Sequence, residues 1–197
     1  KYFASRKNDK LRILEIGVSG ANSLKVWRDY FSKSYICGID IDKNSLNYKE
    51  EGYDIFLCNQ TDEQGLRMLV DQAGPFDIII DDGSHFMSHI IKSFEVLFPY
   101  LNQDGLYIIE DLHTCYLKEY QDGQNVYDYF REKINDLNLG GKNIKSVICG
   151  DRQRQFARLE GKMEFTAEEL SIQAIHFHPS VIVVEKKLLE SKSNIEK

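Results

Sequence analysis

The sequence of 197 residues lacks the features that mark several classes of protein. No apolar stretch approaches the roughly 20 residues of a membrane-spanning helix, and there is no recognisable signal peptide. There is also no internal repeat and no low-complexity linker. The first residue is Lys1 rather than Met, so the sequence leaves open a segment before it. These absences and the length predict one globular domain without a membrane span.

Positive charge is in deficit, and the cysteines follow no metal-binding pattern. Lys and Arg number 25 against 31 Asp and Glu, which gives a formal net charge of −6. This balance argues against nucleic acid or an anionic membrane as the main partner and favours a small molecule. Cys37, Cys58, Cys115 and Cys149 lack metal-finger and C-x-x-C spacing, and three of them lie in apolar runs. We therefore expect reduced thiols and a cytoplasmic protein.

Two short apolar runs each end in a pair of acidic residues: Phe76–Ile80 before Asp81 and Asp82, and Leu106–Ile109 before Glu110 and Asp111. Such a run is typical of a buried parallel strand whose carboxyl end opens into a site. Because neighbouring strands lie roughly 5 Å apart, we expect these four carboxylates to crowd one small volume with His85 and His113. Like charges at that range oppose folding unless a cation lies among them. The sequence therefore predicts a divalent metal site.

Strand and helix patterns alternate around these runs. The predicted strands are Leu11–Ile16, Tyr35–Ile39, Tyr53–Cys58, Phe76–Ile80 and Leu106–Ile109. Helical patterns follow the first four, namely a run from Leu24 to Phe31, a short helix from Lys43, Glu63–Gln72, and Ile90–Leu101. We expect Asn102–Gly105 to be a turn. Right-handed crossovers make this an α/β fold with an open, mostly parallel sheet, whose ligands bind at the carboxyl ends of the strands.

The last third of the chain is less regular. A polar, tyrosine-rich segment at about 117–141 predicts a helical insertion over the site, and a strand-like run follows at Asn143–Cys149. The locally basic stretch Asp151–Met163 is interpreted as a solvated loop. Ile172–His178 and Val181–Glu185 predict an antiparallel hairpin. We expect a single domain over 1–190 and a frayed tail over 191–197.

The first strand leads into a glycine-bearing turn, E-I-G-V-S-G, from Glu15 to Gly20. Asp40 ends the second strand about twenty residues later, where a ribose-binding acid is expected in a nucleoside-binding unit. The turn lacks G-x-G-x-x-G, so a pyrophosphate cradle is not indicated. An ordinary tight turn at Gly17 and Gly20 is the structural alternative. A nucleoside ligand without pyrophosphate is the favoured interpretation.

Six motifs together resemble the class I S-adenosylmethionine-dependent methyltransferases. Within that family they are most similar to the metal-dependent sugar O-methyltransferases of macrolide and related glycoside biosynthesis, including mycinamicin and rhamnosyl O-methyltransferases. The motifs are L-E-I-G-V-S-G, G-I-D-I-D, N-Q-T-D, F-D-I-I-I-D-D-G-S-H, F-P-Y-L-N-Q-D-G-L-Y-I-I-E-D-L-H-T-C-Y and I-H-F-H-P-S-V-I-V-V-E-K. D-D-G-S-H joined to I-E-D-L-H-T is the most specific. N-Q-T-D and H-F-H-P depart from the family pattern.

The resemblance implies a Rossmann-like fold with a seven-stranded sheet, helices on both faces, and a role for each matched residue. Asp82, Glu110 and Asp111 would hold Mg²⁺ or another divalent cation, and His85 would be the general base, with Asp82 beside it. The residues expected to contact S-adenosyl-L-methionine are Glu15, Gly17 and Ser19 at the methionine moiety, Asp40 at the ribose, Gln60 and Asp62 at the adenine end, and Asp81. His113 and Tyr116 would contact the acceptor. Asp62 is equally well explained as a helix N-cap.

These assignments predict methyl transfer to a hydroxyl of a sugar or glycoconjugate. A metal-coordinated hydroxyl has a lowered pKa, and an imidazole that titrates near 6.5 can accept its proton. The alternatives are a non-haem iron oxygenase that uses His85, Asp82 and His113 as its iron ligands, a methyltransferase of a small phosphorylated compound, and a nucleoside-binding module without catalysis. His89, His176 and His178 are interpreted as structural. The acceptor and the oligomeric state, including a homo-oligomer, stay open.

Overall fold

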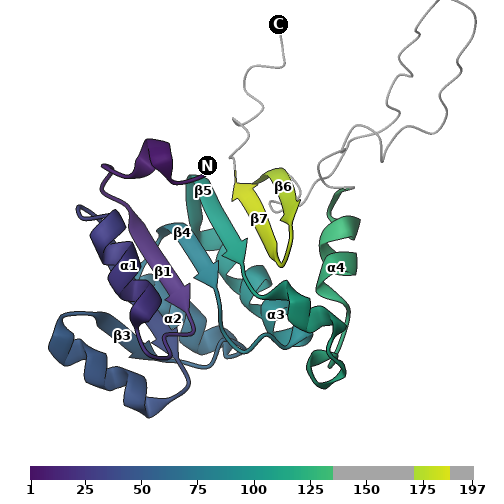
Figure 1. Cartoon of the computed structure of the whole chain (residues 1–197), viewed down its shortest axis with the longest axis horizontal. Helices are drawn as coiled ribbons and strands as arrows, with labels where there is room; N and C mark the ends of the chain where they lie inside the picture. Colours follow the sequence, from purple (N-terminus) through teal and green to yellow (C-terminus); the bar gives the residue numbers. More distant parts are fainter. Residues whose placement is uncertain (135–170, 187–197) are drawn as a thin grey trace, which may run out of the picture.

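The computed structural model describes residues 1–134 and 171–186. In this part of the chain, seven strands form one sheet in the order β3-β2-β1-β4-β5-β7-β6 (Figure 1). The strands are β1 (Arg12–Ile16), β2 (Tyr35–Asp40), β3 (Asp54–Leu57), β4 (Phe76–Asp81), β5 (Leu101–Ile109), β6 (Ile172–His178) and β7 (Val181–Lys186). The first five are parallel, and β7 runs antiparallel to both β5 and β6. The predicted parallel sheet with a C-terminal hairpin is confirmed.

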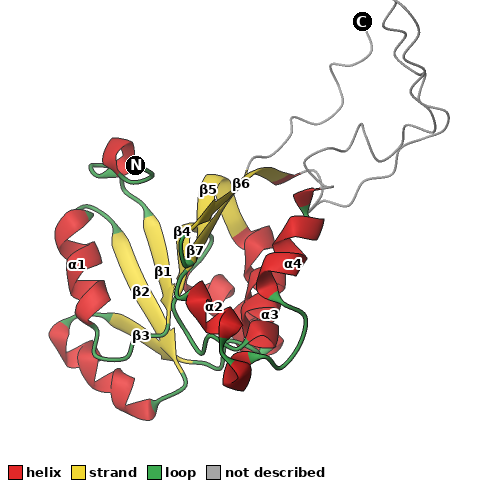
Figure 2. Cartoon of the chain, turned by 45° about the vertical axis from the view of Figure 1, so that its right-hand side comes forward, coloured by secondary structure: helices red, strands yellow, loops and turns green. Residues whose placement is uncertain are grey.

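Helices cover both faces of this sheet (Figure 2). The α-helices are α1 (Asn22–Tyr30), α2 (Glu63–Ala73), α3 (Met87–Leu97) and α4 (Val126–Glu132). The 3₁₀ helices are η1 (Ala4–Arg6), η2 (Lys43–Glu51), η3 (Phe98–Tyr100), η4 (Leu112–Tyr116) and η5 (Lys118–Tyr120). Leu24 of α1 packs into one buried cluster, whereas Leu66 of α2, Phe94 of α3 and Phe130 of α4 pack into another. The fold therefore has three layers, as expected for an α/β protein.

The central strands end level with one another, and this places the site. Ile16 at the end of β1 is in register with Ile39 of β2 on one side and with Asp81 of β4 on the other, and Asp81 is in register with Ile109 of β5. Since side chains on both faces of these strands are buried, the apolar runs are nearly continuous. The residues after each strand consequently meet at one edge of the sheet.

Two predicted boundaries need correction. β5 begins at Leu101 rather than at Leu106, so the predicted turn Asn102–Gly105 lies inside the strand. The backbone of β5 is nevertheless irregular at these residues, since the register with β4 shifts here and Asp104 has a left-handed φ of 56°. α3 ends at Leu97 because the chain tightens into η3, which contains Pro99.

Several predictions fall beyond the described residues. These are the end of the insertion from 135 to 141, the strand at Asn143–Cys149, the loop at Asp151–Met163 and the tail over 191–197. Among the residues that are described, no helix has the length and apolar character needed to cross a membrane.

Candidate active site

The turn after β1 is shaped by Gly17. Its φ of 91° is left-handed, and a Cβ built on it would overlap the backbone carbonyl oxygen of Asp82. The Gly17 amide donates to the carbonyl of Ile39 at 2.9 Å, and the Asp82 amide donates to the carbonyl of Ile16 at 3.0 Å. Only glycine satisfies both the angle and the space. The turn after β1 therefore lies directly against the turn after β4.

Asp40 organises the same turn from the end of β2. Its Oδ2 accepts hydrogen bonds from the amides of Val18 and Ser19, each at 2.9 Å. Its Oδ1 accepts from the amide of Asp42 at 2.8 Å. A carboxylate that accepts several amide hydrogen bonds is held in one orientation. Asp40 is thus a fixed group at the rim of the sheet edge.

A cavity of about 240 Å³ opens at the ends of β1, β2 and β4. Among the residues predicted to contact the cofactor, Gly17, Ser19, Asp40 and Gln60 line it, together with Asp82. The sequence-based assignment missed further lining residues, namely Ile41, Cys58, Asn59, Ser84 and His89. A signal for His89 was present, since it lies one helical turn after the predicted base. His89 was interpreted as structural, and its ring nitrogen Nδ1 is 2.8 Å from the hydroxyl of Ser84.

Glu15 directly precedes Ile16, which lines this cavity, and 1% of its own surface is exposed. One carboxylate oxygen accepts a hydrogen bond from the hydroxyl of Ser23, while Oε2 is buried without a hydrogen-bond partner among the described residues. Burial raises the pKa of Glu15 to about 7, and the charges of Asp82 and Glu110 add to the effect of burial. The side chain of Trp27, whose Nε1 is likewise buried without a hydrogen-bond partner among the described residues, lowers this pKa in part.

The environment of Asp81 differs from the one predicted, in which this carboxylate joined the acidic group at the strand ends. Its side chain is 1% exposed and faces the core, where it accepts hydrogen bonds from Ser93, Tyr107 and Gln60. Burial raises its pKa to about 6 despite these donors. Adjacent residues of a strand point to opposite sides, so Asp81 does not join the acidic group in which Asp82 lies.

Gln60 and Asp62 also have structural partners. The amide oxygen of Gln60 accepts from the Ser84 amide at 2.7 Å, which braces the turn after β4. Asp62 is the N-cap of α2 and accepts from the amide of Gly65 at 3.1 Å, so the capping interpretation is confirmed. Because Asp62 does not line the cavity of about 240 Å³, we leave it out of the proposed cofactor site.

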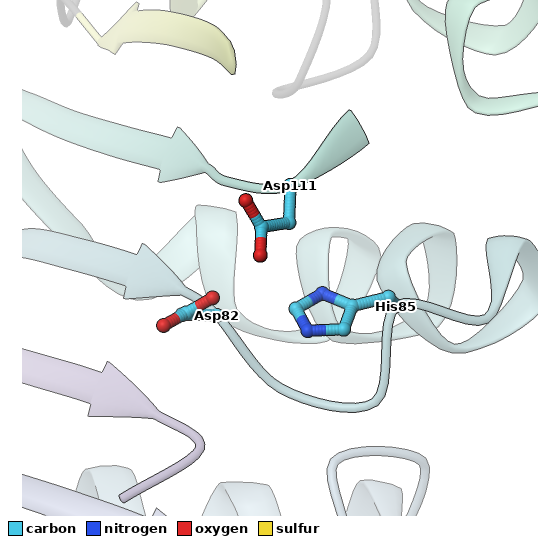
Figure 3. A group of neighbouring side chains, drawn as sticks. All are labelled: Asp82, His85 and Asp111. Atoms are coloured by element: carbon cyan, nitrogen blue, oxygen red, sulfur yellow. The ribbon is translucent and has the colours of Figure 1, made fainter. Parts of the chain in front are cut away.

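Asp82, His85 and Asp111 converge beside the cavity (Figure 3). Each offers a ligand atom, and these atoms all lie within 4.8 Å of one another. His85 has a φ of 62° and Asp111 a φ of 54°, both in the left-handed region. Strained residues of this kind cluster at functional sites. Burial raises the pKa of Asp82. The charge of His85 opposes this shift, and the charge of Asp111 adds to it. We call these three residues the acidic cluster.

The other predicted metal and acceptor residues surround the acidic cluster. Glu110 does not supply a ligand atom to this group, yet burial and the charges of Asp82 and Asp111 raise its pKa. His113 is held by the β6–β7 turn, since its Nδ1 lies 3.0 Å from the hydroxyl of Ser180. The same Nδ1 lies 3.8 Å from Oδ1 of Asp111, but His113 is not one of the three residues whose ligand atoms converge. The iron-oxygenase alternative requires His113 among them. Tyr116 is 76% exposed.

The donor set of the acidic cluster fits a hard divalent cation. Asp82 and Asp111 supply carboxylate oxygens, the ligands that Mg²⁺ prefers, and Glu110 adds negative charge. Burial is the main cause of the raised pKa values of Asp82 and Glu110, and the repulsion from neighbouring carboxylates, which a cation would relieve, adds to it. A ring nitrogen of His85 lies in the same group.

The strand order and the cavity at the carboxyl ends define a class I methyltransferase fold. A methyltransferase from the mycinamycin biosynthetic pathway, solved in complex with Mg and S-adenosylhomocysteine (SAH), matches with a TM-score of 0.77 and 29% identity, over 95% of this chain and 48% of that one. No family model matches the sequence. The homologues of the chain are sugar O-methyltransferases of macrolide and tetracenomycin pathways.

Two of these relatives give the extent of the match. The 8-demethyl-8-alpha-L-rhamnosyl tetracenomycin-C 2'-O-methyltransferase of Streptomyces olivaceus is 32% identical over 194 residues, covering 95% of this chain and 48% of the relative. The demethylmacrocin O-methyltransferase of Streptomyces fradiae is 30% identical over 193 residues, covering 94% and 47%. The chain thus spans about half the length of the curated relatives it matches.

Proposed function

We propose that the chain is the catalytic part of an S-adenosylmethionine-dependent and divalent-metal-dependent O-methyltransferase, which methylates a sugar hydroxyl of a glycosylated natural product. The observation that carries this proposal is the position of Asp82. It lines the cavity of about 240 Å³ and also belongs to the acidic cluster. A nucleoside ligand and a divalent cation would therefore meet at one residue.

On the cofactor side, the chain supplies a preshaped turn and fixed acids. S-adenosyl-L-methionine, when bound, supplies a methyl group on a sulfonium, which is a good leaving group. Gly17 lets the backbone approach closely, and Asp40 is oriented by amide hydrogen bonds so that its carboxylate can meet the ribose hydroxyls. Glu15 offers its unpartnered oxygen to the positively charged methionine end. These residues would hold the cofactor in the cavity that Asp82 lines, next to the acidic cluster.

On the acceptor side, Asp82 and Asp111 would hold the cation, with Glu110 beside them. A bound divalent cation lowers the pKa of a coordinated sugar hydroxyl. His85 lies in the same group and accepts the hydroxyl proton at a ring nitrogen as the oxygen attacks. His113 and Tyr116 follow Asp111 along η4, and from there they would contact the acceptor sugar. The new oxygen–carbon bond would form as the carbon–sulfur bond of the sulfonium breaks, so that the products would be the methyl ether, S-adenosylhomocysteine and a protonated His85.

The proposed acceptor class rests on the relatives. Their names specify methyl transfer to a rhamnosyl group of a tetracenomycin and to demethylmacrocin, and the mycinamycin-pathway enzyme has been solved with Mg, SAH and mycinamycin VI. A glycoside of an apolar natural product is therefore the acceptor we propose. The free thiols of Cys37, Cys58 and Cys115 support a reducing, cytoplasmic setting.

The test is transfer of a labelled methyl group from S-adenosyl-L-methionine to a panel of glycosides that includes demethylmacrocin and mycinamycin VI. We expect product with Mg²⁺, loss of product in excess EDTA, and recovery when Mg²⁺ is added back. Full activity in EDTA would contradict the role of the metal. Turnover that needs iron and oxygen but no S-adenosyl-L-methionine would contradict the whole proposal.

A further inference from the structure

Helix α3 begins directly after the loop that carries Asp82 and His85, yet it has no cap of its own. Its N-cap residue Phe86 makes no side-chain hydrogen bond to the helix. Asp122 supplies the cap instead, from 34 residues further along the chain. Its Oδ1 accepts from the amide of Ser88 at 2.9 Å, and its Oδ2 accepts from the Ser88 hydroxyl. A distant segment thus performs the capping that a local residue normally performs.

Two residues earlier, Tyr120 packs against the loop itself. Its ring lies 6.4 Å from the ring of His85 in an edge-on arrangement, and 5.4 Å from the ring of Phe86. Aromatic pairs at these distances attract one another in defined orientations. Because His85 has a left-handed φ of 62°, it needs surroundings that hold it in this conformation. Tyr120 is one of the groups that do so.

The same segment is also tied to the loop that carries Asp111. Gln121 donates from its side-chain amide to the carbonyl of Cys115 at 3.0 Å. Cys115 belongs to η4, whose N-cap is Asp111. At Gly123, an added Cβ would lie only 3.3 Å from Cβ of Ser88, so glycine permits the close approach. Consecutive residues therefore contact both loops of the acidic cluster.

We propose that residues Tyr120–Gly123 act as a clasp, which sets the separation of the Asp82 and His85 loop from the Asp111 loop and so positions the ligands of the metal. Asp122 and Tyr120 are positioning residues in this account, since neither belongs to the acidic cluster. The inference rests on the proposed function, because it requires the acidic cluster to bind a divalent cation. The cofactor cavity is not lined by the clasp.

The test measures binding of Mn²⁺ to the full-length protein by electron paramagnetic resonance, and binding of SAH by calorimetry. Groups that orient metal ligands change affinity roughly 10- to 100-fold. The clasp residues contact the loops that carry the ligands rather than the ligands' own donor groups. We therefore expect Asp122→Ala and Tyr120→Ala to weaken Mn²⁺ binding by about fivefold. Affinity for SAH should fall much less than affinity for Mn²⁺, because most of the residues that line the cavity lie outside this loop.

Conservative variants and a distant control separate positioning from general loss of stability. Asp122→Asn keeps an acceptor for the Ser88 amide, and Tyr120→Phe keeps the ring, so both should bind Mn²⁺ as the wild type does. Asp77→Ala is the control. The Asp77 carboxylate likewise accepts one backbone and one side-chain hydrogen bond, from Arg12 at 2.7 Å and from Asn102 at 2.9 Å, but at the opposite edge of the sheet. It should lower Tm and leave Mn²⁺ binding unchanged.

The outcomes distinguish the clasp from the function on which it rests. Wild-type Mn²⁺ affinity in both alanine variants would overturn the clasp and leave the proposed function standing. Parallel losses of Mn²⁺ and SAH binding would also overturn it, because they would indicate general unfolding. A wild-type protein that binds no Mn²⁺ would overturn the metal site and the clasp together.

Discussion

Glu15 makes the stability of the ligand-free protein dependent on pH in a direction opposite to that of most carboxylates. Burial raises its pKa from 4.5 to about 7. Between these two values the folded state holds a proton that the unfolded state has lost, so the free energy of unfolding falls as pH rises. Integrated from pH 5 to pH 8, this one group removes about 2 to 3 kcal/mol of stability.

The substitution that isolates this effect is Glu15→Gln. The glutamine has the size of the protonated acid and retains an acceptor for the Ser23 hydroxyl. Urea unfolding of wild type and variant at pH 5 and pH 8 gives the difference in their free energies of unfolding. We expect the variant to gain about 2 to 3 kcal/mol over the wild type across this range.

A control with the opposite sign is available at the surface. Hydrogen bonds from Lys92 and Arg67 lower the pKa of Glu63, so its contribution to stability is present at high pH and is lost in acid. Glu63→Gln should therefore lose stability relative to the wild type at pH 8, where Glu15→Gln gains it. If the free energy of unfolding changed with pH in the same way in the wild type and in Glu15→Gln, the assigned effect of burial on the Glu15 carboxyl would be refuted.

Three further substitutions, two of them with a matched control, test the fold and the site. Gly17→Ala should abolish SAH binding measured by calorimetry, because the added Cβ would overlap the backbone of Asp82. The control is Gly52→Ala, where φ is a similar 85° but the space around the added Cβ is open. It should lower the free energy of unfolding by about 1 to 2 kcal/mol and leave SAH binding intact. Lys186→Met removes the side-chain donor to three backbone carbonyls and should cost about 2 kcal/mol in urea unfolding. Lys92→Met, which breaks one exposed ion pair, should change the free energy of unfolding far less. His85→Asn, which tolerates the left-handed φ, should lower methyl transfer at least roughly 100-fold with unchanged SAH affinity.

The sequence was sufficient to predict the sheet because its signals are local. Apolar runs that end in acids predicted β4 and β5, and strand-helix alternation predicted a mostly parallel sheet. The runs Ile172–His178 and Val181–Glu185 predicted the C-terminal hairpin. Asp82 and Asp111 were grouped correctly, since strand ends meet at one edge. The E-I-G-V-S-G motif predicted a glycine-bearing turn, and Gly17 has a left-handed φ in that turn.

What the sequence left undetermined depends on partners far along the chain. Asp81 and Asp82 are indistinguishable by spacing, and only Ser93 of α3 and Tyr107 of β5 show which one faces the core. The cap of α3 by Asp122 spans 34 residues and has no local pattern. His89 was interpreted as a structural residue, because its position at the cavity depends on how α3 packs, which the sequence does not show.

The most direct test of the account is a crystal of the protein grown with SAH and soaked in Mn²⁺, with anomalous diffraction used to locate the ion. We predict one strong anomalous peak between the carboxylates of Asp82 and Asp111, next to SAH in the cavity beside Gly17. SAH at that place with no ion at the acidic cluster, or an ion bound elsewhere, would contradict the claim that metal and cofactor share this edge of the sheet.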